Sequence, residues 1–227
     1  WNIDTEKKFF NEALKHFASP KQLFYKFADD YYAYIPKNQK NNGQTLQSRN
    51  SLIGQFTEKW CKDLLEPIAS KHGLFAVNSV VCEEVGLTKR SDADVAFCTT
   101  SSKNQKSENI KLIFEVKMSI VSNYKYLHNS NQLTHIGDYK THKGTPSILR
   151  SDSMLKAIGK SINIRVSGSS STTIPIIILG NTPITNSYKN KVDFLKASGV
   201  IQGFLSLFPN PTSTDFISHT SGKGFQT

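Results

Sequence analysis

The sequence predicts a mixed α/β domain with a central mixed sheet of four to five strands, flanked by helices and preceded by an N-terminal helical segment. The chain has 227 residues, of which 37 % are hydrophobic, and this is enough to bury a core. Apolar stripes with helical spacing alternate along it with short apolar runs of strand length. The predicted order is helix, three strands, helix, strand, helix, strand.

The first 50 residues are predicted to form a helical segment followed by a loop. From Thr5 to Tyr34 aromatic and aliphatic residues, among them Phe9, Phe10 and Phe17, recur at helix-like spacing. The loop covers residues 37–50, which are rich in Asn, Gln and Lys. We expect this segment to pack on a core domain that covers residues 51–208.

The first helix of that core is predicted from Ser51 to Glu66. Its apolar residues recur at steps of three and four and form one stripe, namely Ile53, Phe56, Trp60 and Leu64. Pro67 should end or kink the helix, because proline lacks the backbone N–H that a helix interior needs.

Three strands should follow as a meander. They are predicted at Leu74–Val85, Asp94–Cys98 and Lys111–Ile120, and the polar segment Thr99–Asn109 connects the second to the third.

A basic, loop-like insertion at residues 123–150 is predicted next, followed by a helix that opens at Ser151 or Asp152. Lys156 and Lys160 should face away from the core. The residues expected to point inward are Met154, Leu155, Ile158 and Ile162.

The last elements are a fully buried strand at Ile174–Leu179, a helix from Ser187 to Ala197 that closes at Gly199, and a strand at Val200–Phe208. Residues 209–227 are expected to be a tail.

The charge of the chain favours a polyanionic partner, either nucleic acid or an acidic surface. Its 28 Lys and Arg exceed its 18 Asp and Glu, for a formal net charge of +10. Aromatic side chains interleave with cations in the insertion, which makes it the best candidate for DNA contact. The candidate DNA-binding residues are Lys125, Lys140, Lys143, Arg150, Ser151, Lys156 and Lys160. The alternative is a mobile basic surface without sequence readout.

Composition also excludes some classes of protein. No run of about 18 apolar residues is present, so a membrane span is not expected. The three cysteines form no CxxC pair, and the segment with His128, His135 and His142 lacks the helical pattern that would align these side chains. We therefore expect no zinc site, and a reducing bacterial cytoplasm as the compartment.

Two acids and a lysine are predicted to meet on one face of the meander. Glu115 and Lys117 are two residues apart in a strand, so they point the same way. If the hairpin closes symmetrically about its loop, the numbers of paired residues sum to 209, and Asp94 faces Glu115. Opposed carboxylates about 5 Å apart destabilise a sheet unless a cation lies between them. Oxygen ligands of this kind suit Mg²⁺.

Lys117 would then stand beside the metal ion, where its ammonium group orients or helps to deprotonate an attacking water. The alternative is that Lys117 pairs with Asp92, which the same register places opposite it, and that the whole patch is a solvated salt-bridge face.

Ala93 and Asp94, followed after twenty residues by Glu115, Val116 and Lys117, resemble the signature of the PD-(D/E)XK nucleases. The resemblance spans about Asn50 to Leu179, and Ala93 stands where the name of the family has Pro. It implies a restriction-endonuclease-like core, Mg²⁺ as cofactor with Mn²⁺ as a substitute, and products with 5′-phosphate ends. Asp94, Glu115 and the backbone carbonyl of Val116 would bind the metal ion, and Lys117 would be catalytic.

The segment from Arg49 to Glu58 resembles the first-helix pattern of several restriction endonucleases, an Arg, then a Gly and a Glu four residues on. In that pattern Glu58 helps to bind metal and joins the catalytic set. Gly54 suggests a close backbone approach, because glycine inside a helix costs about 1 kcal/mol relative to alanine. The alternative for Glu58 is a surface pair with Lys62. Glu83, Glu84 and Asp92 are reserve acids.

We therefore expect a type II-like restriction endonuclease that cuts double-stranded DNA, as a homodimer if its site is a palindrome. One alternative is a nuclease of the same fold in repair, recombination or toxin roles that acts on structured DNA or RNA. The other is a nucleic-acid-binding domain without catalysis.

Overall fold

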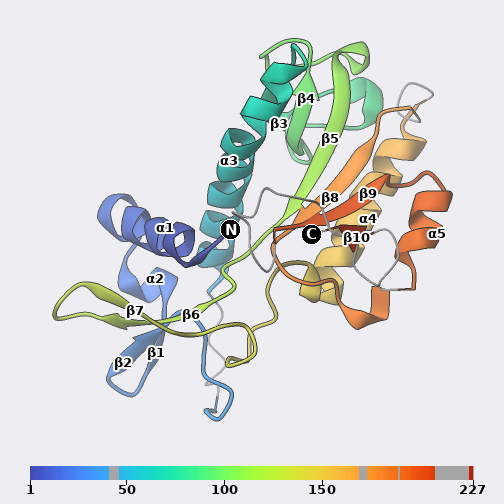
Figure 1. Ribbon diagram of the computed structural model, residues 1–227. Helices are drawn as coiled ribbons and strands as arrows, with labels where there is room; N and C mark the ends of the chain where they lie inside the picture. Colours follow the sequence, from blue (N-terminus) through green and yellow to red (C-terminus); the bar gives the residue numbers. More distant parts are fainter. Residues whose placement is uncertain (41–45, 169–172, 189, 208–224, 227) are drawn as a thin grey trace.

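The computed structural model describes residues 1–40, 46–168, 173–188, 190–207 and 225–226. It is a mixed α/β structure with two sheets, one of six strands and one of four (Figure 1). In this part of the chain no helix is long and apolar enough to cross a membrane.

The larger sheet contains the predicted meander. Its strand order is β10-β9-β8-β5-β4-β3; β3, β4 and β5 pair antiparallel, and the other neighbours pair parallel. The strands are β3 (Phe75–Val80), β4 (Ala93–Cys98), β5 (Ile110–Lys117), β8 (Ile176–Gly180), β9 (Gly203–Ser206) and β10 (Phe225–Gln226). The predicted core strands are confirmed, although β3 ends well before Val85. β10 adds a strand in the region expected to be a tail.

The predicted hairpin register is confirmed. Val95 pairs with Phe114 and Phe97 with Leu112, so paired numbers sum to 209, as a symmetric loop requires. A register shift occurs between Phe97 and Cys98, at the loop end of the hairpin. The other end keeps its alignment, and continuing it places Asp94 opposite Glu115.

Helices cover both faces of this sheet. On β4, Val95 and Phe97 belong to a core cluster with residues of α3 (Gln47–Lys71), whereas Ala96 and Cys98 belong to a second cluster with residues of α4 (Ser151–Val166). Because side chains alternate along a strand, the two clusters lie on opposite faces. By the same alternation, the side chains of Asp94, Glu115 and Lys117 point to the face that α4 covers.

The first core helix is longer than predicted, because α3 runs through Pro67 to Lys71. Pro67 is exposed, and so is Asp63, whose carbonyl loses its helical partner because proline has no N–H. The buried stripe also differs, since Leu64 is 40 % exposed while Thr57, Cys61 and Leu65 are buried.

Helix α4 begins at Ser151 as predicted, but its inward face was predicted wrongly in part. Met154 and Ile158 are buried, whereas Leu155 is 61 % and Ile162 is 44 % exposed. The buried face runs through Ala157, Ser161 and Ile164 instead. This rotation turns Lys160 toward the sheet.

The predicted N-terminal helical segment and loop-like insertion are both wrong in part, because strands from each form the four-stranded sheet. Helices α1 (Ile3–His16) and α2 (Pro20–Leu23) are followed by a hairpin, and the insertion contributes a second hairpin. The antiparallel order is β1-β2-β6-β7, with β1 (Tyr25–Phe27), β2 (Asp30–Tyr32), β6 (Asn123–Leu127) and β7 (Gln132–Gly137). Ala28, with φ 52°, makes the tight turn between β1 and β2.

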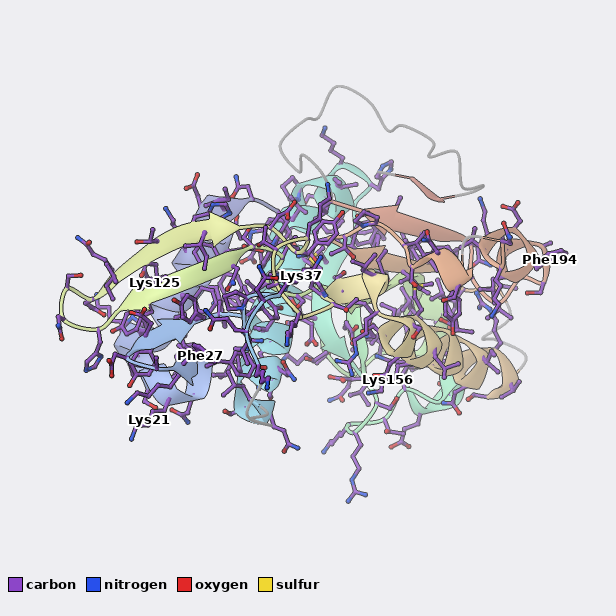
Figure 2. The ribbon with its side chains drawn as sticks, turned by 90° about the horizontal axis from the view of Figure 1, so that it is seen from below. Lys21, Phe27, Lys37, Lys125, Lys156 and Phe194 are labelled. Atoms are coloured by element: carbon purple, nitrogen blue, oxygen red, sulfur yellow. The ribbon has the colours of Figure 1, made fainter. Side chains whose placement is uncertain are left out.

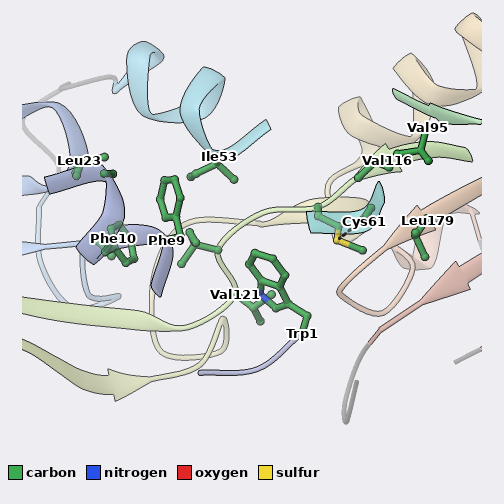
Figure 3. Packing of buried hydrophobic residues seen from close by; sticks show 14 of the residues in the cluster. Trp1, Phe9, Phe10, Leu23, Ile53, Cys61, Val95, Val116, Val121 and Leu179 are labelled. Carbon is green, nitrogen blue, oxygen red and sulfur yellow. Dashed lines mark hydrogen bonds between the residues drawn. The ribbon is translucent and has the colours of Figure 1, made fainter. Parts of the chain in front are cut away.

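Aromatic packing joins this sheet to the rest of the molecule. Phe24 stacks on Tyr126 with ring centroids 5.0 Å apart, and Phe10 stacks on Phe24 at 4.9 Å. Figure 3 shows the continuation of this core through Phe9 to Ile53 on α3. The N-terminal segment and the insertion therefore form one structural unit against α3.

Near the end of the described chain, the predicted helix from Ser187 to Ala197 is only partly α-helical. A 3₁₀ turn at Asn186–Tyr188 precedes α5 (Val192–Ala197), which closes at Gly199 with φ 72° as predicted. The predicted end of the last strand, Phe208, lies outside the described residues. Cys61, Cys82 and Cys98 are buried and free.

Candidate active site

Asp94 and Glu115 lie side by side near the ends of β4 and β5, almost fully buried. Asp94 is 8 % exposed and Glu115 is 3 % exposed. The backbone N–H of Val116 donates to Asp94 Oδ2 at 2.7 Å, and this bond holds one carboxylate against the neighbouring strand. The strand pairing thus positions both acids on the face that α4 covers.

Lys117 completes the predicted cluster. Its Nζ lies 2.5 Å from Glu115 Oε1 and 3.2 Å from Asp94 Oδ2, and it also donates to the carbonyl oxygen of Val116 at 3.0 Å. The alternative in which Lys117 is held by Asp92 away from both acids is therefore wrong.

Lys160 is a second lysine in the cluster. The prediction that it faces outward as a DNA contact is therefore wrong as to its orientation. Its Nζ lies 2.9 Å from Asp94 Oδ1 and 2.6 Å from Glu115 Oε2, and its side chain is 17 % exposed. The contact with Oε2 is close but not aligned as a hydrogen bond. The orientation of Lys160 was predicted wrongly because the wrong face of α4 was expected to be buried. Ala157 and Ser161 are small residues next to Lys160 on the face that is buried, and they could have indicated that face.

The two ammonium groups set the protonation of the acids in different ways. Burial opposes ionisation of Asp94, but Lys117 and Lys160 outweigh it and hold the Asp94 pKa below its ordinary value. Burial and the charge of Asp94 together raise the pKa of Glu115. Burial disfavours both ammonium ions, yet the two carboxylates prevail and raise the pKa of Lys117 and of Lys160.

Glu58 lies on α3, near enough to the cluster for the charges of Asp94 and Lys117 to act on it. Burial, followed by the charge of Asp94, raises its pKa to about 7. The predicted alternative, a surface pair with Lys62, is not what the structure has: Lys62 lies 3.5 Å from Asp63 and 3.7 Å from Glu66. Gly54 makes no close backbone approach, because a Cβ there would meet Glu58 Oε1 first, at 3.9 Å.

A pocket of about 520 Å³ opens beside the cluster. Glu58 and Lys117 line it, together with three of the predicted DNA-binding residues, Lys143, Arg150 and Lys156. Asp152 also lines the pocket, 3.4 Å from Arg150 and 3.2 Å from Lys156, so it offsets part of their positive charge. Of the acids in the cluster, Glu58 lines the pocket itself.

The other predicted DNA-binding residues lie elsewhere. Lys125 is on the four-stranded sheet, 2.9 Å from Asp30, and Figure 2 shows it well apart from Lys156. Lys140 lies over the ring of Tyr139 at 5.8 Å, and Ser151 is the exposed first residue of α4.

Arg49 is a pocket residue whose role the sequence did not indicate. Its side chain is buried, with the guanidinium carbon 4.6 Å from the centroid of Tyr34 and 5.3 Å from that of Tyr25, and it donates to the carbonyl of Ala33. It therefore ties α3 to the β1–β2 unit and shapes the pocket wall.

The reserve acids are not part of the cluster. Glu84 accepts hydrogen bonds from Ser107, and Glu83 precedes it in the same 3₁₀ turn. Asp92 lies near enough to Glu58 to raise its pKa further.

The donor set fits Mg²⁺, the ion that the family resemblance implies. Among the described residues no three or more His, Cys, Asp or Glu side chains form a metal cage. Mg²⁺ nevertheless requires only one or two carboxylates, because it keeps several waters. Asp94, Glu115 and the Val116 carbonyl supply hard oxygens at one place, and Glu115 Oε2 is a buried acceptor without an aligned donor.

Comparison with known proteins adds no relative: no family model, curated protein or solved structure matches this chain.

Proposed function

We propose that this protein is a Mg²⁺-dependent endonuclease of the PD-(D/E)XK type that hydrolyses phosphodiester bonds in double-stranded DNA, as a type II restriction endonuclease does. The observation that carries the proposal is the convergence of Asp94, Glu115 and Lys117. These residues come from two strands, yet one ammonium group contacts both carboxylates. That is the arrangement expected for hydrolysis at a metal-bound phosphate.

In this proposal Asp94, Glu115 and the Val116 carbonyl hold the cation. When bound, Mg²⁺ polarises the phosphoryl oxygen and makes an attacking water more acidic. Lys117, with its raised pKa, stays protonated, so it orients the water and offsets negative charge on the phosphate rather than accepting a proton. Glu58, whose pKa is about 7, is the side chain in the pocket best suited to exchange a proton near neutral pH.

Lys143, Arg150 and Lys156 support DNA as the substrate, because they place positive charge in the pocket beside the cluster. A net charge of +10 favours the same class of partner. A homodimer belongs to the proposal as the form that would cut a palindromic site.

Plasmid digestion with Mg²⁺, with Mn²⁺ and with EDTA tests the proposal. We expect cutting by the wild type with either metal and none in EDTA. Lys117→Met should lower the rate by about 10²-fold or more, the usual effect of losing a charge-stabilising group. Lys111→Met is the matched control, because Lys111 lies on the same strand, is exposed and contacts the carbonyl of Glu108.

The products distinguish the proposal from its alternatives. Discrete bands support restriction, whereas cutting confined to branched DNA or RNA points to a nuclease with another role. Glu115→Gln should abolish cutting and spare DNA affinity. DNA binding without cutting under any of these conditions would leave only a binding domain.

A further inference from the structure

Lys160 occupies a particular place in the acid cluster. Its Nζ contacts Asp94 Oδ1 and Glu115 Oε2, whereas Lys117 contacts Oδ2 and Oε1 of the same two residues. Each carboxylate therefore has one oxygen facing each lysine. Both ammonium groups are largely buried, with side chains 22 % and 17 % exposed.

We propose that Lys160 is an internal counter-ion that holds the metal position between Asp94 and Glu115, and that a divalent cation binds there by displacing it. This inference rests on the proposed function, because it concerns the same metal site. It adds a residue from α4 that the two-strand signature does not contain.

Charge and geometry both require the displacement. Two carboxylates and two ammonium groups sum to zero, so the cluster is already neutral. A divalent ion would bring the charge of these groups to +2, and the departure of one lysine would lower it to +1. Displacement therefore reduces the uncompensated buried charge, which is costly. Oδ1 and Oε2 are the oxygens that Lys160 covers, and they can serve as metal ligands only after it leaves.

Lys160 is the lysine free to leave. Lys117 is also held by the carbonyl of Val116, next to it in β5, whereas Lys160 contacts the two acids within the described part of the chain. Its four-carbon stem lets the ammonium swing along α4. One turn earlier on that helix Lys156 lines the pocket with its side chain 71 % exposed, so a released Lys160 would reach solvent and the pocket mouth.

Metal affinity measured without DNA tests the inference. Mn²⁺ is titrated into metal-free full-length protein, and the free ion is followed by electron paramagnetic resonance. Lys160→Met keeps the length of the side chain and removes the competing charge, so we expect its Kd for Mn²⁺ to fall by about tenfold or more. Lys111→Met, which replaces an exposed lysine on β5, should change the Kd by less than about twofold.

Thermal unfolding gives a second readout that works even if the variant is weak. In EDTA Lys160→Met should have a lower Tm than wild type, because two buried acids share one lysine. Mn²⁺ should raise its Tm more than it raises that of wild type. If Lys160→Met is unfolded in EDTA, folding on addition of Mn²⁺ is the expected result, and continued unfolding overturns the inference.

The outcomes separate this inference from the proposed function. Equal or weaker Mn²⁺ binding by Lys160→Met, with plasmid cutting by the wild type, overturns the counter-ion role and leaves the nuclease standing. Mn²⁺ binding by neither protein overturns the counter-ion role as well, and plasmid cutting then decides the function separately. Tighter binding by the variant without any cutting supports the displaced lysine and removes the nuclease.

Discussion

Asp94 and Glu115 are neighbours with similar burial, yet their pKa values move in opposite directions. Asp94 receives a backbone N–H from Val116 in addition to the two ammonium groups, and a fixed donor favours the charged form. Within the described residues no backbone N–H donates to Glu115, and the charge of Asp94 further disfavours its ionised form. Asp94 therefore favours its charged form more strongly than Glu115 does.

Glu58 should make stability depend on pH. Its pKa in the folded protein is about 7, above the ordinary 4.5, so the folded state keeps a proton that the unfolded state has lost between these values. The contribution of Glu58 to stability should fall as pH rises from 4.5 to 7 and level off above that range. In EDTA, Glu58→Gln should flatten this slope, so the variant gains on wild type between pH 5 and pH 8 in urea denaturation. An identical pH slope in both proteins would contradict the raised pKa of Glu58.

Glu6 should be a strong determinant of stability, because one buried carboxylate satisfies several donors. Trp1 Nε1 and Tyr124 Oη donate to it at 2.7 and 2.9 Å, and the backbone N–H groups of Val121 and Ser122 also donate. Glu6→Ala would leave buried donors unpaired, at a cost of about 2–4 kcal/mol in the free energy of unfolding. Urea denaturation measures it.

Glu12→Ala is the matched control for Glu6 on the same helix. Glu12 is exposed and lies 3.9 Å from Lys8, so its loss should cost less than about 0.5 kcal/mol. A comparable loss in both variants would contradict the anchoring role of Glu6.

Among the elements, α3 should be more stable without its proline. Pro67 interrupts the helical hydrogen bonds of Gln47–Lys71 at an exposed position. Pro67→Ala should raise the free energy of unfolding by about 1–2 kcal/mol, after allowance for the greater freedom of the unfolded chain. Ser70→Ala, also exposed and in the same last turns, should change it by less than about 0.5 kcal/mol. A loss of stability in Pro67→Ala would mean that the proline ring is required by packing.

The elements that could be predicted were those fixed by local rules. A polar loop between two apolar runs set the β4–β5 register, and that register brought Asp94, Glu115 and Lys117 together. The β1–β2 hairpin could not be found in this way, because its aromatic spacing also fits a helix. Its stabilising partner, β6, lies far along the chain, where Tyr31 pairs with Tyr126.

Lys160 was missed for a different physical reason. Helix α4 has apolar residues on both its buried and its exposed side, so its sequence does not define one inward face. The two acids on the sheet face that α4 covers decide the orientation of Lys160, and the sequence of the helix alone does not contain this tertiary contact.

At the scale of the whole molecule, the excess positive charge should appear in the salt dependence of DNA binding. Each phosphate neutralised adds about 0.9 to the slope of log K against log salt. Three of the expected contacts line the pocket. Replacing them with glutamine should lower the slope by about 2–3, as measured by fluorescence anisotropy with Ca²⁺ in place of Mg²⁺. These residues are Lys143, Arg150 and Lys156.

A control with the same loss of net charge separates local contact from the general field of the protein. Lys71, Lys103 and Lys106 are exposed at the end of α3 and in the β4–β5 loop, at the opposite end of the larger sheet from the pocket (Figure 1). Their replacement by glutamine removes three charges as well, but no pocket contact. If DNA lies across the pocket, the control keeps the wild-type slope while overall affinity falls slightly. Equal slopes in the two triple variants would mean that DNA follows the charge of the whole molecule and that the pocket does not select its path.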